Sequence, residues 1–288
     1  MVIWTMAKNP YNIREIFDDM ALELIQSQRR TFLRHQKEEL KEGFKWEQWQ
    51  LAKLRELNKY RQANKKIIGK YSPEIDKAVY QTLKNNYDAG GNRVLNLIKT
   101  LIDQLKAMLN GGRELEIELP KDVPSLSDYI KKLERPPAET SFFGINEKKL
   151  AALQKVVKKD MRKAQHAVLR KMDDVYRQTI YKSQIYMSSG ATTLGQAIDM
   201  STKDFLAQGI NCIQYKDGKM VNVASWAEMS LRTASHRATM LGEGSKMDEW
   251  DMHLIVITAH GNTCELCLPW QGRSEEHTSE LQSLAYLV

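Results

Sequence analysis

The sequence predicts a mainly α-helical protein in which long N-terminal helices and a long central amphipathic helix precede a small, truncated α+β C-terminal domain. Three observations support this fold class. Residues 13–70 are dense in Glu, Lys, Arg, Gln and Leu and contain no proline. Apolar residues recur at helical spacing from about residue 146 into the 180s, and short apolar segments separated by turn residues follow Gly190.

The N-terminal region, residues 1–112, is expected to form helical hairpins. Ser72-Pro73-Glu74 has the residue types of a helix start, with a capping serine, a proline at the first helical position and an acid near the positive end of the helix dipole. The helix that follows is expected to run toward Leu109. Gly90-Gly91 is expected to divide it because paired glycines are costly inside a helix, and Asn110-Gly111-Gly112 is expected to end it.

Residues 113–144 read as a connector. Four prolines interrupt any long helix there, at positions 120, 124, 136 and 137. The run Ser125-Leu126-Ser127-Asp128 predicts a short helix inside this connector.

Residues 145–190 are predicted to form one long amphipathic helix. Its apolar positions follow a 3-4-4 spacing that repeats every eleven residues, which keeps them on one nearly straight stripe. The stripe consists of Leu150, Leu153, Val157, Met161, Ala164, Val168, Met172, Val175 and Thr179. This pattern indicates a long, nearly straight helix with one apolar side that can pack against other helices.

The same helix carries eleven Lys or Arg and three Asp between Lys148 and Lys182. One interpretation is a basic face that binds nucleic acid or an acidic partner protein. The other is an ordinary solvated face, since positions opposite an apolar stripe must be polar. The candidate binding residues are Lys155, Lys158, Lys159, Arg162, Lys163, Arg170 and Lys171.

Residues 191–272 are predicted to form the truncated α+β domain. A helix is expected from Ala191 to Gly209, followed by a strand, a Lys216-Asp217-Gly218-Lys219 turn and a second strand, because Asp-Gly between apolar segments is a strong hairpin signal. A further helix is expected over about residues 225–240, with Gly242-Glu243-Gly244 as a turn after it. Leu254 to Thr258 reads as a buried strand.

Cys264 and Cys267 follow that strand in a CxxC arrangement, which can direct two thiolates to one zinc ion but supplies only half of a tetrahedral set. His260 or His253 are candidate further ligands, and a second pair beyond the end of this chain is an alternative. A redox role needs a helix that begins at the motif, and Pro269 argues against that helix. Two semi-buried thiols without metal are an equally open interpretation. Cys212, on a predicted strand, is expected in the core.

No cofactor other than zinc is suggested, and no serine elbow, phosphate loop, HExxH motif or pair of catalytic acids is found. His236 reads as a surface histidine on a basic helix. We therefore expect no enzymatic activity. No signal sequence or membrane span is expected, and three cysteines suit a reducing compartment such as a bacterial cytoplasm. The net charge of +7 points to an acidic partner, with nucleic acid the usual candidate.

Residues 273–288 are expected to be a non-native tail. Residues 273–283 resemble, codon for codon, the translation of a common sequencing-adapter oligonucleotide. The alternative is a genuine acidic, polar C-terminal helix. If the tail is foreign, the native protein continues differently after Gly272.

Several motifs together resemble the phage minor capsid protein 2 family. They are Phe142 to Glu147, Gly190 to Ile210, Ala227-Glu228-Met229 with Arg232-Thr233-Ala234, Gly242 to Gly244, and Cys264-x-x-Cys267-x-Pro269-x-x-Gly272. The resemblance extends from Tyr11 onward and is more specific after Phe142.

The resemblance implies a minor structural component of tailed-phage or prophage heads of mainly Gram-positive bacteria, usually encoded beside the portal protein. We would then expect a place in the virion near the portal vertex, assembly in the host cytoplasm, a role in head assembly or DNA packaging, and portal, other head proteins and packaged DNA as partners. Family members continue past the CxxC turn into a His-Pro-x-Cys segment, so this chain would hold half of a metal site. The alternatives are a cytoplasmic, basic nucleic-acid-binding protein with a zinc-knuckle-like end, or a head domain that carries a toxin or transferase module.

Overall fold

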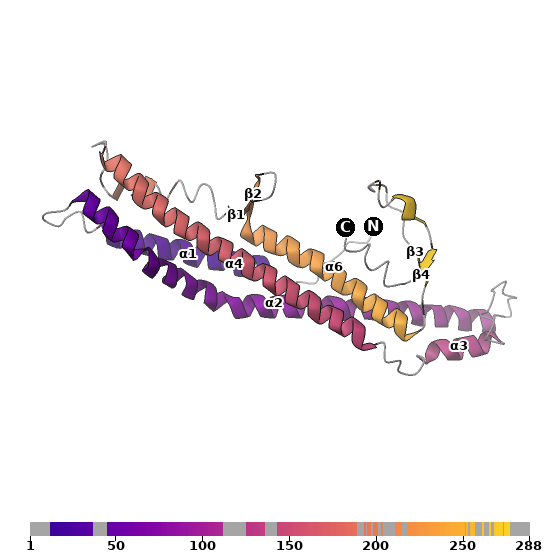
Figure 1. Cartoon of the computed structure of the whole chain (residues 1–288). Helices are drawn as coiled ribbons and strands as arrows, with labels where there is room; N and C mark the ends of the chain where they lie inside the picture. Colours follow the sequence, from indigo (N-terminus) through magenta and orange to yellow (C-terminus); the bar gives the residue numbers. More distant parts are fainter. Residues whose placement is uncertain are drawn as a thin grey trace. The chain divides into compact units, whose positions relative to one another are not determined.

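The computed structural model confirms a mainly α-helical chain (Figure 1). It describes residues 12–36, 45–111, 125–135, 143–188, 193, 195–196, 198–200, 203, 211–214, 218–250, 252, 254–256, 261, 265, 268–272 and 274–276. The helices are α1 (Ile13–Gln36), α2 (Trp46–Asn110), α3 (Leu126–Glu134), α4 (Phe143–Ser188) and α6 (Val223–Glu249), with a short 3-10 helix η1 (Leu268–Trp270). Within these described segments, no helix combines the length and the apolarity that crossing a membrane requires.

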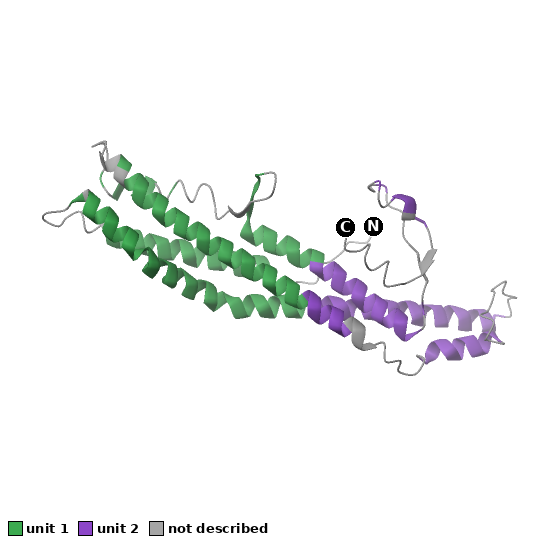
Figure 2. Cartoon of the chain, viewed as in Figure 1, with its two compact units in different colours: residues 1–82, 154–233 green, residues 83–153, 234–288 purple. Residues whose placement is uncertain are grey.

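The chain divides into two compact units, each built from two separate stretches of sequence (Figure 2). Unit 1 comprises residues 1–82 and 154–233, and unit 2 comprises residues 83–153 and 234–288. Helices α2, α4 and α6 therefore contribute residues to both units.

Unit 1 contains the predicted hairpin of α1 and the first part of α2. The Ser27 hydroxyl donates to Asn64 Oδ1 over 3.3 Å, and Lys70 Nζ lies 2.8 Å from Glu23 Oε2. The earlier of the two α1 residues contacts the later of the two α2 residues, so the two helices are antiparallel. Their shared interior includes five fully buried side chains: Phe17, Met20, Leu24, Ile75 and Val79.

The eleven-residue stripe of α4 is confirmed in unit 1. Every predicted position from Val157 onward is buried: Val157, Met161, Ala164, Val168, Met172, Val175 and Thr179. Leu150 and Leu153, at the other end of the stripe, are half-buried. Removing a continuous stripe of this kind from water is what holds α4 against its neighbours.

Two predicted interruptions of α2 are wrong. Pro73 lies inside the helix, and the Ser72 hydroxyl, expected to cap a new helix, instead donates back to the Ile68 carbonyl over 3.1 Å. A proline cannot donate to the carbonyl four residues earlier, which here belongs to the exposed Gly69, where water can take the place of the missing donor. Gly90 and Gly91 also lie inside α2, which ends at Asn110 as predicted.

The paired glycines allow α2 and α6 to cross at backbone contact within unit 2. A methyl group on Gly90 would overlap the main-chain oxygen of Thr239, and one on Gly242 would overlap that of Tyr87. The predicted turn at Gly242-Glu243-Gly244 is therefore wrong, since these residues lie inside α6, which extends to Glu249. Tertiary packing at this crossing overrides the low helix propensity of glycine.

The core of unit 2 is completed by α3, the short helix predicted in the connector. Ser125 caps it by accepting from the Asp128 amide over 3.2 Å. Its Ile130 and Leu133 pack against a buried row on α2 formed by Val94, Ile98, Ile102 and Leu105. At the end of α6, Trp250 Nε1 donates to the Leu133 carbonyl over 3.1 Å and ties α6 to this cluster.

The described strands form two short antiparallel pairs. Strand β1 (Asn211–Gln214) pairs with β2 (Met220–Asn222), and Gly218 between them has a φ of 83°, as the predicted Asp-Gly hairpin requires. Strand β3 (Leu254–Val256) pairs with β4 (Ser274–Glu276), so β4 uses residues of the stretch that resembles adapter translation. Most of the helix predicted over residues 191–209 lies outside the described residues, although 195–196, 198–200 and 203 are helical.

Candidate functional site: the basic face of α4

The outward side of α4 carries a continuous line of exposed residues. Opposite the buried stripe, exposed positions succeed one another at spacings of four, four and three residues, which is the same eleven-residue repeat. In unit 1 these positions are Lys155, Lys159, Lys163, His166, Arg170, Asp174 and Arg177, here named the α4 basic line. It contains five permanent cations and one carboxylate.

The inward side of α4 is anchored by polar contacts that fix its rotation. The buried Tyr176 hydroxyl donates to the Lys53 carbonyl over 2.9 Å and lies 3.3 Å from His35 Nε2. Farther along, Asp173 Oδ2 accepts from Arg61 Nε over 2.6 Å. Burial raises the pKa of Asp173, although Arg61 acts in the opposite direction. These anchors hold the α4 basic line toward solvent.

The seven predicted binding residues fall into two groups. Lys155, Lys159, Lys163 and Arg170 lie on the α4 basic line, whereas Lys158, Arg162 and Lys171 are half-buried beside it.

Two of the flanking cations have partners inside unit 1. Arg162 donates to Asp76 Oδ2 over 2.5 Å and to Gln165 Oε1 over 2.9 Å. The Lys158 amine stands 5.9 Å from the centre of the Tyr80 ring. On the line itself, Lys163 is paired with Asp160 at 2.8 Å. Among the seven predicted residues, the cations best placed to meet a partner are therefore Lys155, Lys159 and Arg170.

The sequence interpretation missed His166 and Arg177. The signal was present, because positions midway between members of the buried stripe repeat with the same eleven-residue period. Ranking residues by position on that period, rather than by local density of charge, would have included both of them and excluded Arg162.

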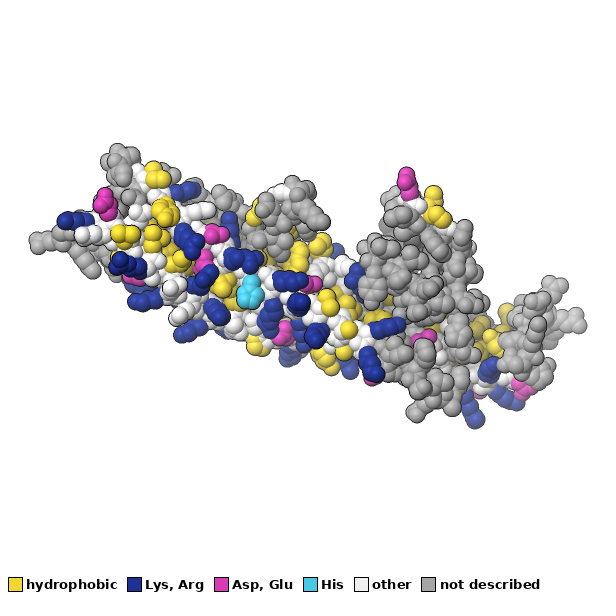
Figure 3. Space-filling view, viewed as in Figure 1, with side chains coloured by type: hydrophobic (Ala, Val, Ile, Leu, Met, Phe, Trp, Pro, Cys, Tyr) yellow, Lys and Arg dark blue, Asp and Glu magenta, His cyan; other side chains and the backbone are white. Residues whose placement is uncertain are grey.

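Positive charge is concentrated in unit 1. Its described residues include 25 Lys or Arg and 13 Asp or Glu, whereas the described residues of unit 2 include 11 of each. Figure 3 shows dark blue side chains gathered on the surface over α4, with few magenta ones among them. The α4 basic line thus lies in the strongly basic unit of the chain.

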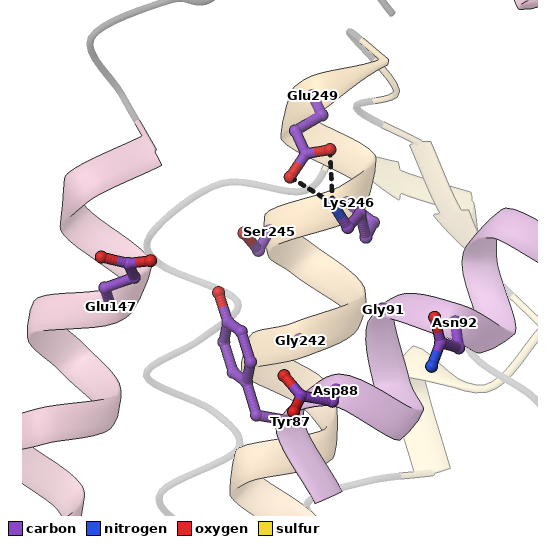
Figure 4. Close-up of a pocket in the computed structure, with 9 residues that line it drawn as sticks. All are labelled: Tyr87, Asp88, Gly91, Asn92, Glu147, Gly242, Ser245, Lys246 and Glu249. Atoms are coloured by element: carbon purple, nitrogen blue, oxygen red, sulfur yellow. Dashed lines mark hydrogen bonds and ion pairs between the residues drawn. The ribbon is translucent and has the colours of Figure 1, made fainter. Parts of the chain in front are cut away.

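Unit 2 contains a polar cavity of about 460 Å³ between α2, α4 and α6 (Figure 4). Glu147 projects from α4 toward the side chains of Tyr87 and Ser245, while Lys246 Nζ donates to both carboxylate oxygens of Glu249, over 2.7 and 2.6 Å. The lining is completed by Asp88, Gly91, Asn92 and Gly242. No three His, Cys, Asp or Glu side chains come together as a metal site anywhere in the described part of the chain.

The predicted thiol site falls outside the described residues. Cys264, Cys267, His253 and His260 are not described, and neither is the side chain of Cys212 on β1. A zinc half-site at Cys264 and Cys267 stays a prediction. His236 is exposed on α6, as predicted.

Long helices that bury one continuous stripe and expose a basic line define a mainly helical protein with a basic surface. A model of the phage minor capsid protein 2 family matches residues 120–284, more than half of the chain, and the chain belongs to this family. It is thus a structural component of phage heads. The match includes α3, α4 and α6, begins after the end of α2, and runs through residues 273–283. No curated protein and no solved structure matches the chain.

Proposed function

We propose that this protein is a non-enzymatic minor component at the portal vertex of a tailed-phage or prophage head, where it acts in head assembly or DNA packaging. Its membership of the phage minor capsid protein 2 family carries the proposal. The family resemblance also implies a gene beside that of the portal protein. Assembly would take place in the host cytoplasm before the protein becomes part of the virion.

The outward side of α4 offers a surface for a head-protein partner at its C-terminal end. The exposed line continues past Arg177 to Tyr181 and Ile185, whose exposed fractions are 51% and 66%. Adjacent large apolar side chains left in water are typical of protein interaction sites. We assign this end of α4 to a contact with the portal or a neighbouring head protein, because a minor capsid protein is incorporated through such contacts.

The proposal is tested by incorporation into particles. We expect the wild-type protein to co-purify with heads, to be located at a single vertex by immunogold labelling, and to cross-link to the portal. The double variant Tyr181→Ser, Ile185→Ser should be incorporated at least about ten-fold less, which corresponds to about 1.4 kcal/mol of lost binding free energy.

Leu97→Ser with Leu109→Ser provides a matched control in unit 2. These two side chains are also exposed, at 64% and 49%, so this variant loses a similar amount of surface apolar area and should be incorporated like the wild type. Absence of the wild-type protein from purified particles would contradict the proposal and favour the cytoplasmic nucleic-acid-binding alternative. Labelling spread over the whole capsid would contradict the portal-vertex position.

A further inference from the structure

We propose that the α4 basic line binds the sugar–phosphate backbone of duplex DNA without regard to sequence. Its cations are exposed, they lie in the unit that carries the excess positive charge, and their direction is fixed by the buried contacts of Tyr176 and Asp173. The inference deepens the proposed role by naming the partner of this surface, but it does not depend on the portal-vertex position.

The dimensions of the line match a duplex. From Lys155 to Arg177 the helix rises roughly 33 Å at 1.5 Å per residue. One turn of B-DNA measures about 34 Å and carries one phosphate charge for about every 1.7 Å of its axis. Successive line positions are three or four residues apart, or about 5 to 6 Å, so each flexible Lys or Arg can reach a different phosphate.

The composition of the line favours DNA over an acidic protein. No apolar side chain occupies any of its seven positions. The exposed Val156 flanks the line, and the larger apolar residues Tyr181 and Ile185 come after Arg177. Stable protein–protein interfaces have apolar cores in which lysine is depleted. Interfaces with DNA are instead more polar and strongly positive.

The line is also poorly suited to reading bases. Asn and Gln, which recognise adenine by paired hydrogen bonds, are absent from its seven positions, and its Lys and Arg face outward from a helix surface rather than from a helix end inserted in a groove. Affinity should therefore be independent of sequence and in the micromolar range or weaker at physiological salt.

The experiment is a fluorescence anisotropy titration of the full chain against a labelled 36-base-pair duplex of mixed sequence, from 50 to 200 mM salt. About five phosphate contacts predict a slope of log affinity against log salt near −4.5. The triple variant Lys155→Gln, Lys159→Gln, Arg170→Gln should reduce the slope by roughly 2.7 and weaken binding on the order of 100-fold at 0.1 M salt.

A control variant in unit 2 makes the same chemical change elsewhere. Lys84→Gln, Lys99→Gln, Arg135→Gln removes two lysines and one arginine that are also exposed, so it lowers the net charge by the same three units. We expect it to change the affinity by less than about three-fold. Glutamine is a good helix former, and circular dichroism melts should show both variants folded like the wild type.

Three outcomes would overturn the inference. Equal losses in the two triple variants would show that net charge alone attracts DNA. An absence of binding by the wild type at 50 mM salt would remove DNA as the partner. Retained DNA binding by the line variant, with loss of a cross-link to a head protein, would assign the line to a protein partner. DNA binding by a protein that is absent from the portal vertex would overturn the proposed function and leave this inference standing.

Discussion

Two stacked tyrosines in unit 1 differ in how their buried hydroxyls are satisfied. The rings of Tyr60 and Tyr176 lie 4.7 Å apart at an angle of 26°. The Tyr176 hydroxyl donates to the Lys53 carbonyl over 2.9 Å, whereas the Tyr60 hydroxyl forms no hydrogen bond of ordinary geometry among the described residues and has only the nearby Asn64 side chain as a weak partner. Burial raises the pKa of Tyr60, so this hydroxyl stays protonated. One hydroxyl stabilises the fold and the other costs desolvation free energy.

This difference predicts opposite effects of the same substitution. Tyr176→Phe should lower the free energy of unfolding by about 1 kcal/mol because it removes a satisfied donor. Tyr60→Phe should leave the free energy of unfolding unchanged or raise it by up to about 1 kcal/mol. Urea unfolding followed by circular dichroism measures both, with each variant serving as the other's control. Equal losses would show that the Tyr60 hydroxyl has a partner that matters.

Two carboxylates of unit 1 should affect stability with opposite dependence on pH. Burial raises the pKa of Asp173, so its charged form costs stability above the ordinary value of 3.8 and this cost disappears as the pH falls below it. Hydrogen bonds from Lys70 and Tyr71 lower the pKa of Glu23, so its contribution is present above the ordinary value of 4.5 and is lost as the pH falls through the lowered value.

Neutral amide variants isolate these two effects. At pH 7, Asp173→Asn should match or exceed the wild-type free energy of unfolding, while Glu23→Gln should lower it by less than about 1 kcal/mol, as for exposed ion pairs. At pH 3 both differences should shrink toward zero. Chemical denaturation at the two pH values checks this, and a large loss for Asp173→Asn at pH 7 would show that its ion pair with Arg61 outweighs burial.

At the scale of the elements, periodic patterns of apolar residues predicted the helices correctly. Proline and glycine residues, in contrast, led to wrong predictions of where these helices begin and end. The repeat of α4 was readable because a buried stripe requires the same residue class over many turns. Pro73 was misread because its cost depends on exposure, and the Gly69 carbonyl that it leaves without a donor is open to water. Gly90 and Gly242 were misread because their effect depends on a partner distant in sequence, the backbone of another helix. The pairing of Arg162 with Asp76 was unpredictable for the same reason, since 86 residues separate them.

The helix crossing predicts that glycine substitutions in one fold will have opposite signs. Gly242→Ala places a methyl group against the Tyr87 carbonyl, and since backbone cannot yield as a side chain can, the free energy of unfolding should fall by roughly 3 kcal/mol. Gly69→Ala is the control within α2, because nothing lies within 4 Å of the added carbon. It should stabilise the helix by about 0.5 to 1 kcal/mol. Thermal denaturation distinguishes the two, and a neutral Gly242→Ala would mean that the helices do not meet so closely.

At the scale of the whole molecule, the distribution of charge could not be predicted from the order of the sequence. The basic unit is assembled from residues 1–82 and 154–233, with the neutral unit drawn from the stretches between and after them. A count along the chain located the charge of α4 but could not show that the basic stretch of α2 around Lys65 and Lys66 belongs to the same unit. The candidate site was therefore recognised by its charge, while its limits depended on the fold.

Self-repulsion of this charge predicts that salt stabilises unit 1 more than unit 2. With 25 basic and 13 acidic residues described in unit 1, repulsion should destabilise it at low ionic strength, where the screening length is about 30 Å at 0.01 M, and less so at 0.15 M, where it is about 8 Å. Unit 2, with 11 basic and 11 acidic residues described, has no comparable excess of charge.

Hydrogen exchange measures this difference. It should slow with salt at buried α4 positions such as Val168 and Met172, and stay nearly constant at Ile98 and Ile102 of α2. Equal changes in both sets would show that salt acts on the chain as a whole, whereas faster exchange in unit 1 would mean that its ion pairs, such as Lys70 with Glu23, contribute more than the repulsion removes.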